Sequence, residues 1–280
     1  MNFEELSNRF TADEYGIWKS SDNLSVFYPE DGNRAYFQLE DSSFWFQHRN
    51  ECIISAIKRF PPKGPILDVG GGNGYVARRM IDEGFKAILL EPGHLGAFNA
   101  KTKRHIPDVI CSTLENAHFI PNSLDAIGLF DIIEHIENDQ RFVKHVHTVL
   151  KPAGLLYITT PAHHWLWSFS DVSAKHFRRY DEEMFVNLLK EKFDILFFTY
   201  FFRWLVIPIF FLRVIPFRLG LLRKRNVLSS EAEHGIKVNI AVRALTALLK
   251  GETRKIKNKI PRSFGTSCLL VARKGLPPGY

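Results

Sequence analysis

Glycines offer the clearest chemistry in the sequence. Residues 66–80 read ILDVGGGNGYVARRM, with Gly70, Gly72 and Gly74 directly after an apolar run. Because glycine has no β-carbon, the backbone there can adopt positive φ and approach a ligand closely, beside the start of a helix. Glu91 ends the next apolar run, where a carboxylate can accept hydrogen bonds from both hydroxyls of a ribose. These spacings predict a ribose-containing ligand, and a tight turn that only packs a strand against a helix is the alternative.

The glycine spacing disfavours a nicotinamide dinucleotide. That fingerprint requires G-x-G-x-x-G. Its last position is Tyr75 when counted from Gly70, and Ala77 when counted from Gly72. The strict dinucleotide pattern is therefore absent from the sequence.

A second group of reactive side chains follows a later apolar run. Asp131, Glu134 and His135 lie in the stretch FDIIEHI, which we place at the carboxyl end of a strand. An imidazole with an ordinary pKa near ~6.5 can take a proton from a hydroxyl during group transfer. Glu134 and His135 are therefore predicted catalytic residues. Alternatively, they cap the next helix or brace the loop.

Histidines, tryptophans and arginines gather in residues 162–185, a segment without glycine or proline. Indole rings offer flat apolar walls, and guanidinium groups suit carboxylate or phosphate. We predict that the segment contacts the substrate and that His176 joins the catalytic residues. The predicted substrate-binding residues are His164, Trp165, Trp167, Arg178, Arg179 and Tyr180. In the alternative, the segment is a structural flap in which Asp171 pairs with one of these arginines.

Alternating strands and helices must position these side chains. Apolar runs of strand length alternate with helical patterns, which predicts a doubly wound α/β domain with a mostly parallel sheet and helices on both faces. Residues 1–60 are predicted to form a helical cap, and 203–263 a basic, partly apolar helical insertion. The core then comprises residues 61–202 and 264–280. Strands are predicted at 65–70, 86–92, 108–114, 124–133, 154–161, 193–201 and 267–275.

Four motifs in order resemble a known family. LDVGGGNG, LLEP, NSLDAIGLFDIIEHIEND and VLKPAGLLYITTPA are similar to the successive motifs of class I S-adenosylmethionine-dependent methyltransferases, over roughly residues 45–200. The stretch LWSFSDVSAKHFRRY further resembles bacterial methyltransferases of the type 11/12 group, which are often associated with cell-surface glycan or lipid pathways. The resemblance implies a Rossmann-like, seven-stranded sheet. It also implies S-adenosylmethionine as methyl donor and S-adenosylhomocysteine as product.

The resemblance further implies roles by position. Asp68 would orient the glycine loop and contact the methionine amino group, while Glu91 would hold the ribose hydroxyls. Gly70 and Gly72 would pass beneath the methionine and the ribose. Where the family commonly has an acid that binds the adenine amino group, the stretch CSTLEN places a threonine or a leucine. The other residues implied at the cofactor are Gly71, Pro92, Thr113, Leu114, Phe130 and Asp131.

Positive charge is concentrated in the last third of the chain. Residues 203–280 hold 16 of the 37 Lys and Arg but only three of the 30 Asp and Glu, so residues 1–202 have 21 basic against 27 acidic side chains. Such asymmetry suggests an anionic partner, either a membrane surface or a phosphorylated substrate. A solvated basic face is the alternative.

An apolar run at residues 195–215 has nearly the length of a membrane span. Arg203, Arg213 and Pro208 interrupt it, and its first half is needed as a strand. We therefore expect a strand followed by an exposed apolar helix. This helix would close over the substrate pocket, lie in a membrane interface or form a homodimer contact.

Composition limits the class of protein. With 280 residues and 45% hydrophobic side chains, the chain can bury a full core. Cys52, Cys111 and Cys268 are far apart, which suggests neither a disulfide framework nor a zinc knuckle, and no metal site is predicted. The polar N-terminal stretch has no apolar core of a secretory signal. We expect a cytoplasmic protein, with attachment to the inner face of the membrane as a variant of this location.

The predicted function is methyl transfer to oxygen or carbon of a small or lipid- or glycan-linked metabolite. A methyltransferase acting on a quinone ring is the enzymatic alternative. The other alternative is a protein that binds the cofactor or a nucleic acid without catalysis. The basic third shows no recognised nucleic-acid motif, which disfavours a nucleic-acid partner.

Overall fold

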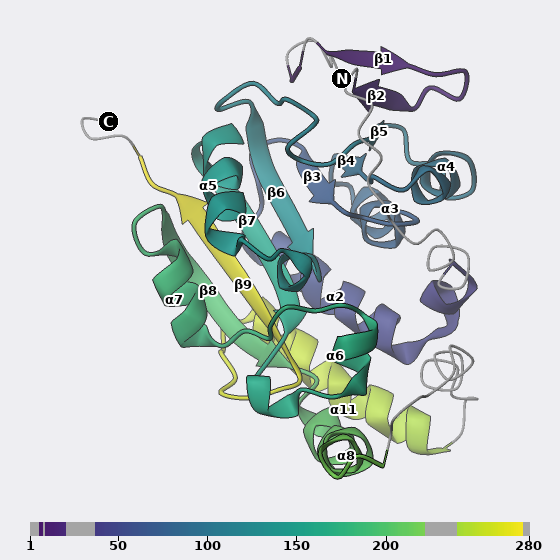
Figure 1. Ribbon diagram of the computed structural model, residues 1–280, viewed down its shortest axis with the longest axis vertical. Helices are drawn as coiled ribbons and strands as arrows, with labels where there is room; N and C mark the ends of the chain where they lie inside the picture. The colour runs from purple at the N-terminus through teal and green to yellow at the C-terminus, as the bar shows by residue number, and fades with distance from the viewer. Residues whose placement is uncertain (1–5, 8, 21–36, 222–239, 277–280) are drawn as a thin grey trace.

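The computed structural model describes residues 6–7, 9–20, 37–221 and 240–276 (Figure 1). Within these ranges, one sheet is flanked by helices. The strands are β1 (Phe10–Ala12), β2 (Trp18–Ser20), β3 (Ile66–Val69), β4 (Ala87–Leu90), β5 (Val109–Cys111), β6 (Leu124–Phe130), β7 (Leu150–Pro161), β8 (Phe193–Phe201) and β9 (Ser267–Lys274). The longer helices are α2 (Phe44–Arg59), α3 (Tyr75–Asp82), α4 (His94–Thr102), α5 (Asp139–Val149), α7 (Glu182–Leu189) and α11 (Ile240–Lys257). The short helical segments are η2 (Ile133–His135), η3 (His164–Leu166), α6 (Phe169–Ser173), η4 (Arg203–Leu205), α8 (Val206–Ile209), η5 (Phe210–Val214) and α9 (Ile215–Arg218).

The strand order is β1-β2-β5-β4-β3-β6-β7-β9-β8. Strands β2 to β7 pair in parallel, whereas β9 lies antiparallel between β7 and β8. This arrangement confirms the predicted α/β class with a mostly parallel sheet.

The described sheet has nine strands rather than the seven expected. The additional pair, β1 and β2, forms an antiparallel hairpin that extends the sheet through Trp18, which lies opposite Ile110 of β5. The cap predicted for residues 1–60 is therefore only partly helical in the described ranges. Strands of three residues are too short to show the alternation on which the prediction relied.

Two apolar clusters lie on opposite faces of the central strands. All four residues of β3 and of β4 are buried, as expected for parallel strands covered on both sides. Leu67 packs in the cluster that includes residues of α5 and α7. Ile66 packs in the cluster that includes residues of α2, α3, α4 and α11. The sheet is therefore a rigid support for the loops at its carboxyl edge.

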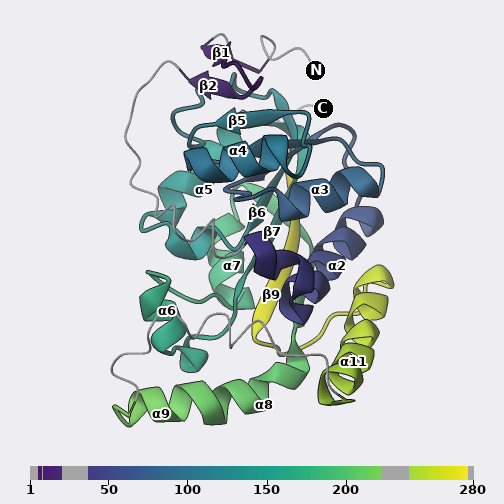
Figure 2. The ribbon, with the colours of Figure 1, turned by 90° about the vertical axis from the view of Figure 1, so that its right-hand side faces the viewer.

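The predicted apolar helix follows β8. Figure 2 shows α8 and α9 along one end of the molecule, joined through η5. Ile207, Phe211 and Leu212 are 70%, 60% and 70% exposed, whereas Val214 is buried. Among the described residues, no helix combines the length and apolar character needed to cross a membrane.

A buried carboxylate fixes the start of this helix. Glu252 of α11 accepts hydrogen bonds from the backbone N–H groups of Phe202, at 2.8 Å, and Arg203, at 2.9 Å. Its Oε2 also lies 3.0 Å from Nε2 of His48 on α2. The apolar helix is thus tied to the core through α11 and α2.

Candidate active site

The glycine loop after β3 leaves no room for side chains. Gly70 has φ +65°, and a β-carbon on it would lie 2.3 Å from Cδ1 of Ile132. A β-carbon on Gly71 would lie 2.2 Å from Cδ1 of Leu89. Real β-carbons do not approach other heavy atoms so closely, so Gly70 allows the β3 turn to lie directly against the turn after β6, and Gly71 allows it to lie against β4. Two loops of the carboxyl edge are thereby brought together.

Glu91 is tied to the same loop. It directly follows β4, is 1% exposed and accepts the Gly72 N–H at 2.8 Å through Oε2. Its Oε1 accepts the Gly93 N–H, also at 2.8 Å. Each carboxylate oxygen can accept more than one hydrogen bond, so a diol can still donate to this group. The position predicted to hold ribose hydroxyls is therefore rigid and chemically suitable.

Asp68 carries a buried carboxyl group beneath the loop. Its burial raises its pKa to about 7; nearby Arg49 opposes the shift and Glu91 adds to it. In the described structure, Oδ2 of Asp68 has no hydrogen-bond partner. A cationic group placed beside it would favour the ionised carboxylate. This orphan oxygen fits the methionine ammonium group of the implied cofactor.

Arg49 is a site residue that sequence reasoning missed. From α2 it forms an ion pair with Asp131, Nε to Oδ2 at 2.5 Å, and donates a hydrogen bond to the Phe130 carbonyl at 2.8 Å. Asp131 has φ +59°, an uncommon conformation for a non-glycine residue. Arg49 thus fixes the turn after β6. Nothing in the helical pattern around it distinguishes this arginine from a surface one.

The three predicted catalytic side chains lie together, although 41 positions separate His135 from His176 in the sequence. The two imidazole rings meet edge to face with centroids 4.7 Å apart. Glu134 is fully buried and accepts the Thr160 hydroxyl at 3.0 Å. The alternative of helix capping is wrong, because Asn138 caps α5.

The two histidines have different surroundings. Partial removal of water by the surrounding protein, followed by the neighbouring His176 ring, lowers the pKa of His135 to about 4, although part of the side chain is exposed. The ring is therefore neutral at pH 7 and a weak proton acceptor. Nδ1 of His176 lies 3.0 Å from Oδ1 of Asp171. Burial tends to raise the pKa of Asp171, but hydrogen bonds from His176 and Arg179 lower it to about 2. An ionised Asp171 therefore orients His176.

Three predicted substrate ligands have charged partners within the protein. Arg179 forms ion-paired hydrogen bonds with Asp171 at 2.7 and 2.9 Å. Arg178 pairs with Asp139 at 2.5 Å, and the buried Tyr180 donates to the same carboxylate at 2.8 Å. The flap alternative, with Asp171 paired to an arginine, thus describes these residues. Their polar groups hold the segment instead of presenting a free anion site.

One of the other aromatic candidates, Trp165, contacts the apolar helix. Trp165 is 43% exposed, and its ring meets Phe210 of η5 at 5.8 Å. The Trp165 carbonyl accepts a hydrogen bond from Arg218 of α9 at 2.9 Å. Nearby, His164 lies against Trp167 with ring centroids 5.4 Å apart. This part of the predicted substrate segment is therefore coupled to the α8–α9 end of the molecule.

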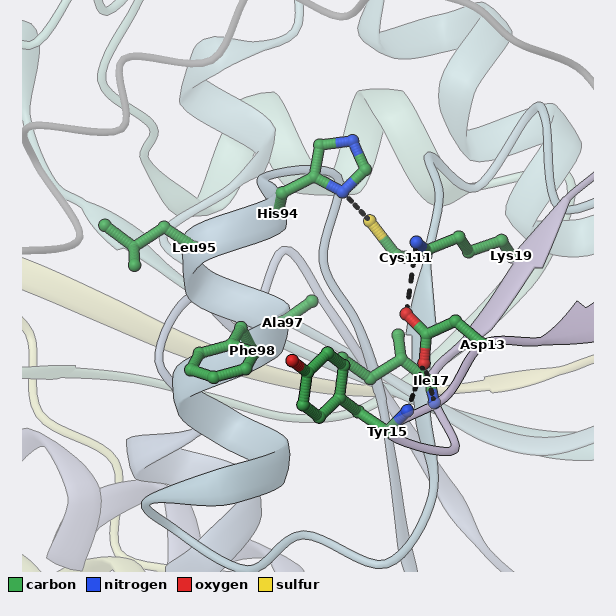
Figure 3. A pocket seen from close by; sticks show the side chains of 9 residues that line it. All are labelled: Asp13, Tyr15, Ile17, Lys19, His94, Leu95, Ala97, Phe98 and Cys111. Atoms are coloured by element: carbon green, nitrogen blue, oxygen red, sulfur yellow. Dashed lines mark hydrogen bonds and ion pairs between the residues drawn. The ribbon is translucent and has the colours of Figure 1, made fainter.

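The residues implied at adenine are mixed in character. Leu114 is 1% exposed within the core, whereas the Thr113 hydroxyl accepts the Asn116 N–H at 3.2 Å. A pocket of about 350 Å³ opens nearby, between the β1–β2 hairpin and α4 (Figure 3). Cys111, which lines this pocket, contacts the Pro92 carbonyl at 3.8 Å. The hairpin that forms one wall could not be found from the sequence pattern.

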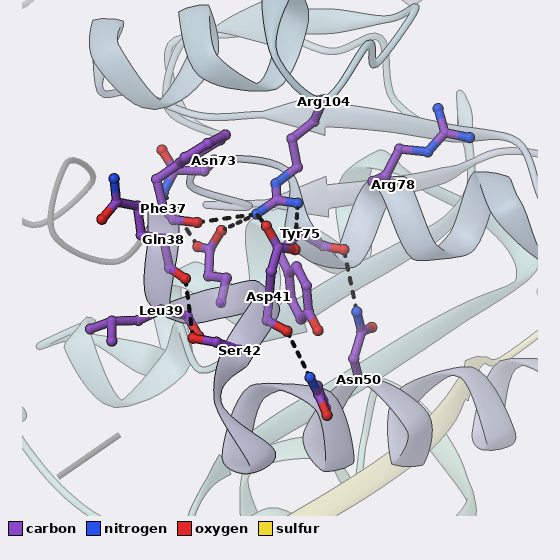
Figure 4. A network of polar contacts seen from close by, with 12 residues as sticks. Phe37, Gln38, Leu39, Asp41, Ser42, Asn50, Asn73, Tyr75, Arg78 and Arg104 are labelled. Carbon is purple, nitrogen blue, oxygen red and sulfur yellow. Dashed lines mark hydrogen bonds and ion pairs between the residues drawn. The ribbon is translucent and has the colours of Figure 1, made fainter. Parts of the chain in front are cut away.

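A polar network ties the N-terminal part to the glycine loop (Figure 4). Arg104 pairs with Glu40 at 3.0 Å and with Asp41 at 2.9 Å. Glu40 in turn accepts a hydrogen bond from the Asn73 side chain at 3.3 Å. Residues 37–42 therefore lie against the loop that carries Gly70 and Gly72.

Comparisons with known proteins agree with this geometry. A family model described as a methyltransferase domain matches residues 45–193, more than half of the chain. A probable S-adenosylmethionine-dependent methyltransferase of Mycolicibacterium smegmatis is 25% identical over 133 residues, covering 48% of this chain and 51% of that protein. A mitochondrial ubiquinone biosynthesis O-methyltransferase of Rattus norvegicus is 29% identical over 103 residues, covering 34% of this chain and 30% of that protein. The chain thus spans about half the length, or less, of these two curated relatives.

The fold is shared with solved structures. Haemonchus contortus phosphoethanolamine N-methyltransferase 2, solved in complex with S-adenosyl-L-methionine, superposes with a TM-score of 0.54 at 20% identity. The superposition covers 90% of this chain and 59% of that chain. At this identity the likeness concerns the fold.

Proposed function

The chain belongs to the S-adenosylmethionine-dependent methyltransferases, and from that premise we propose that it methylates an acceptor held at the carboxyl edge of its sheet. One observation carries the cofactor assignment. The Glu91 carboxylate is joined to the Gly72 N–H at 2.8 Å, beside the buried Asp68, whose Oδ2 has no partner in the described structure. This combination suits a ligand with a ribose diol and a nearby positive charge.

The chemistry requires alignment more than covalent participation by the protein. S-adenosylmethionine, when bound, supplies an electrophilic methyl group on a sulfonium. This chain would hold the acceptor oxygen in line with that methyl group, since orientation can contribute about 7–11 kcal/mol to lowering a barrier. The cluster of Glu134, His135 and His176 would help to ionise the acceptor hydroxyl. We therefore propose O-methylation.

The acceptor that fits best is lipid-linked. The predicted substrate segment contacts the apolar helix through Trp165 and Phe210, and the exposed side chains of that helix are large and hydrophobic. Arginines 203, 213 and 218 accompany them. An amphipathic surface of this kind suits the interface of an anionic membrane. We propose that α8–α9 contacts such a surface and that the acceptor enters from it.

A quinol is the second candidate acceptor. The relative from Rattus norvegicus is named for ubiquinone biosynthesis and O-methylation. A phenolic hydroxyl on a prenylated ring would also reach this site from a membrane. The two candidates share apolar chemistry and differ in the group that is methylated.

Transfer of labelled methyl groups tests the proposal. Purified protein would be incubated with methyl-labelled S-adenosylmethionine and, separately, with glycolipids, quinols and water-soluble metabolites from a bacterial extract. We expect label in the glycolipids, and strongly reduced label when Glu91→Ala replaces the wild type. Label confined to quinols would favour the second candidate. Label confined to water-soluble metabolites would overturn the lipid-linked acceptor.

A further inference from the structure

Glu134, His135 and His176 form a cluster of metal-ligating groups at the predicted active site. A carboxylate oxygen and one ring nitrogen from each histidine all lie within 4.8 Å of one another. Two imidazoles and one carboxylate are a donor set that suits divalent transition metals. From the sequence, these three residues are predicted to be catalytic, and no metal site is predicted.

An unpaired buried oxygen points to a missing partner. Glu134 is fully buried, and its Oε2 accepts the Thr160 hydroxyl. Its Oε1 has no hydrogen-bond partner among the described residues. A buried carboxylate oxygen without a partner costs free energy, about 1–3 kcal/mol or more. A bound cation would satisfy this oxygen.

The surroundings of both histidines resemble those of metal ligands. Nδ1 of His176 is held by Asp171 at 3.0 Å, which leaves its Nε2 for another contact. The ring of His135 hydrogen-bonds to the backbone of Ala174. Metal-ligating histidines commonly use their second nitrogen in this way, because the contact fixes the tautomer and the ring orientation.

We propose that Glu134, His135 and His176 bind one divalent transition-metal ion, such as Zn²⁺, which in turn holds the acceptor oxygen. Bonds of about 2.0–2.2 Å require ligand atoms roughly 3–4 Å apart, so the side chains must close by roughly 1 Å. Three protein ligands leave a position open for the acceptor. The inference deepens the proposed function and rests on it for the role of the ion, although binding of the ion can be tested alone.

The ion would replace direct proton abstraction by histidine. A metal lowers the pKa of a bound hydroxyl, so the acceptor proton passes to solvent. An oxygen lone pair then forms the new bond to the methyl carbon. The carbon–sulfur bond breaks, and its electron pair stays on sulfur as a neutral thioether. No other reactant is needed.

Cobalt titration of the metal-free full chain tests the site. The protein would be stripped with a chelator and titrated with Co²⁺, followed by visible absorption and calorimetry. We expect one equivalent bound through nitrogen and oxygen, with affinity at least tenfold weaker in both Glu134→Gln and His135→Ala. Cys111→Ser is the matched control, because Cys111 and His94, 3.5 Å apart, could bind cobalt by themselves.

Each outcome decides one point. Binding that persists in Glu134→Gln and His135→Ala but is lost in Cys111→Ser would overturn the proposed site, as would no binding by the wild type. Circular dichroism would verify that each variant is folded. S-adenosylmethionine binding would be measured on the same samples. Absence of metal binding by the wild type with intact cofactor binding contradicts this inference alone, whereas intact metal binding by the wild type without cofactor binding contradicts the proposed function alone.

Discussion

At the scale of single residues, we expect Asp68 to link cofactor binding to protonation. Its pKa is raised from 3.8 to about 7, chiefly by burial. For a carboxyl group, a raised pKa means that the unliganded fold loses stability as pH rises from about 4 to 7, because the buried group must ionise. A cationic ligand beside the group instead favours the ionised carboxylate. Binding of S-adenosylmethionine should therefore release a proton and strengthen as pH rises through 7.

Calorimetry at pH 6, 7 and 8 would measure this dependence in the wild type and in Asp68→Asn. The amino group of the cofactor has a pKa of about 8. It contributes equally with both proteins, so the difference in pH dependence between the wild type and Asp68→Asn isolates Asp68. We expect affinity to rise more steeply with pH in the wild type. Equal slopes of affinity against pH in the two proteins would exclude Asp68 as the group that loses its proton on binding.

Gly70 can be tested against a glycine of similar backbone conformation. Gly70 and Gly84 have φ +65° and +86°, but only Gly70 has a neighbouring side chain in the path of a β-carbon. Gly84→Ala should cost about 1–2 kcal/mol of unfolding free energy through backbone strain. Gly70→Ala should cost roughly 1–3 kcal/mol more, because Ile132 must move. Equal urea midpoints for the two variants would show that the two turns do not pack as described.

At the scale of elements, the α8–η5–α9 helix is the clearest departure from an ordinary surface. Its large exposed side chains include Phe211 and Leu212, yet its start is fixed by Glu252. Rigid apolar exposure of this kind normally marks an interaction site. The helix can therefore be altered without touching the glycine loop.

Vesicle sedimentation would test the proposed membrane contact. The double variant Phe211→Glu and Leu212→Glu should lose most binding to anionic vesicles, since it places charge on the inserted face, while S-adenosylmethionine affinity stays unchanged. Leu248→Glu on α11 is a control, because Leu248 is also exposed, at 48%. If the wild type does not bind vesicles, and is a dimer while the double variant is a monomer, the helix is a contact between copies of the chain.

Several elements could be predicted from the sequence because their patterns are local. Strand β8 was predicted at its observed bounds, and the last strand within one residue, since both are continuous apolar runs. The β1–β2 hairpin could not be found, because it depends on pairing with β5. The main prediction for Arg178 and Arg179 was substrate binding, and their ion pairs within the protein were foreseen only in the alternative. Whether an arginine meets a substrate or a carboxylate depends on tertiary contacts such as Asp139 and Asp171.

At the scale of the whole molecule, one sheet edge brings together residues from distant parts of the chain. The loop after β3 supports the cofactor position, the turn after β6 supplies Glu134 and His135, and the segment after β7 supplies His176. That segment also contacts the apolar helix. Parallel strands make this convergence possible, because their carboxyl ends share one edge. The same topology would place the proposed donor site next to the proposed acceptor entrance.

The most direct test of the account is titration of the full chain with S-adenosylmethionine and S-adenosylhomocysteine by calorimetry, for the wild type, Glu91→Ala and the surface control Glu115→Gln. We expect saturable binding of both ligands by the wild type and the control. Affinity should be at least tenfold weaker in Glu91→Ala, because the diol loses its acceptor. Absence of binding by the folded wild type, or unchanged affinity in folded Glu91→Ala, would contradict the central claim.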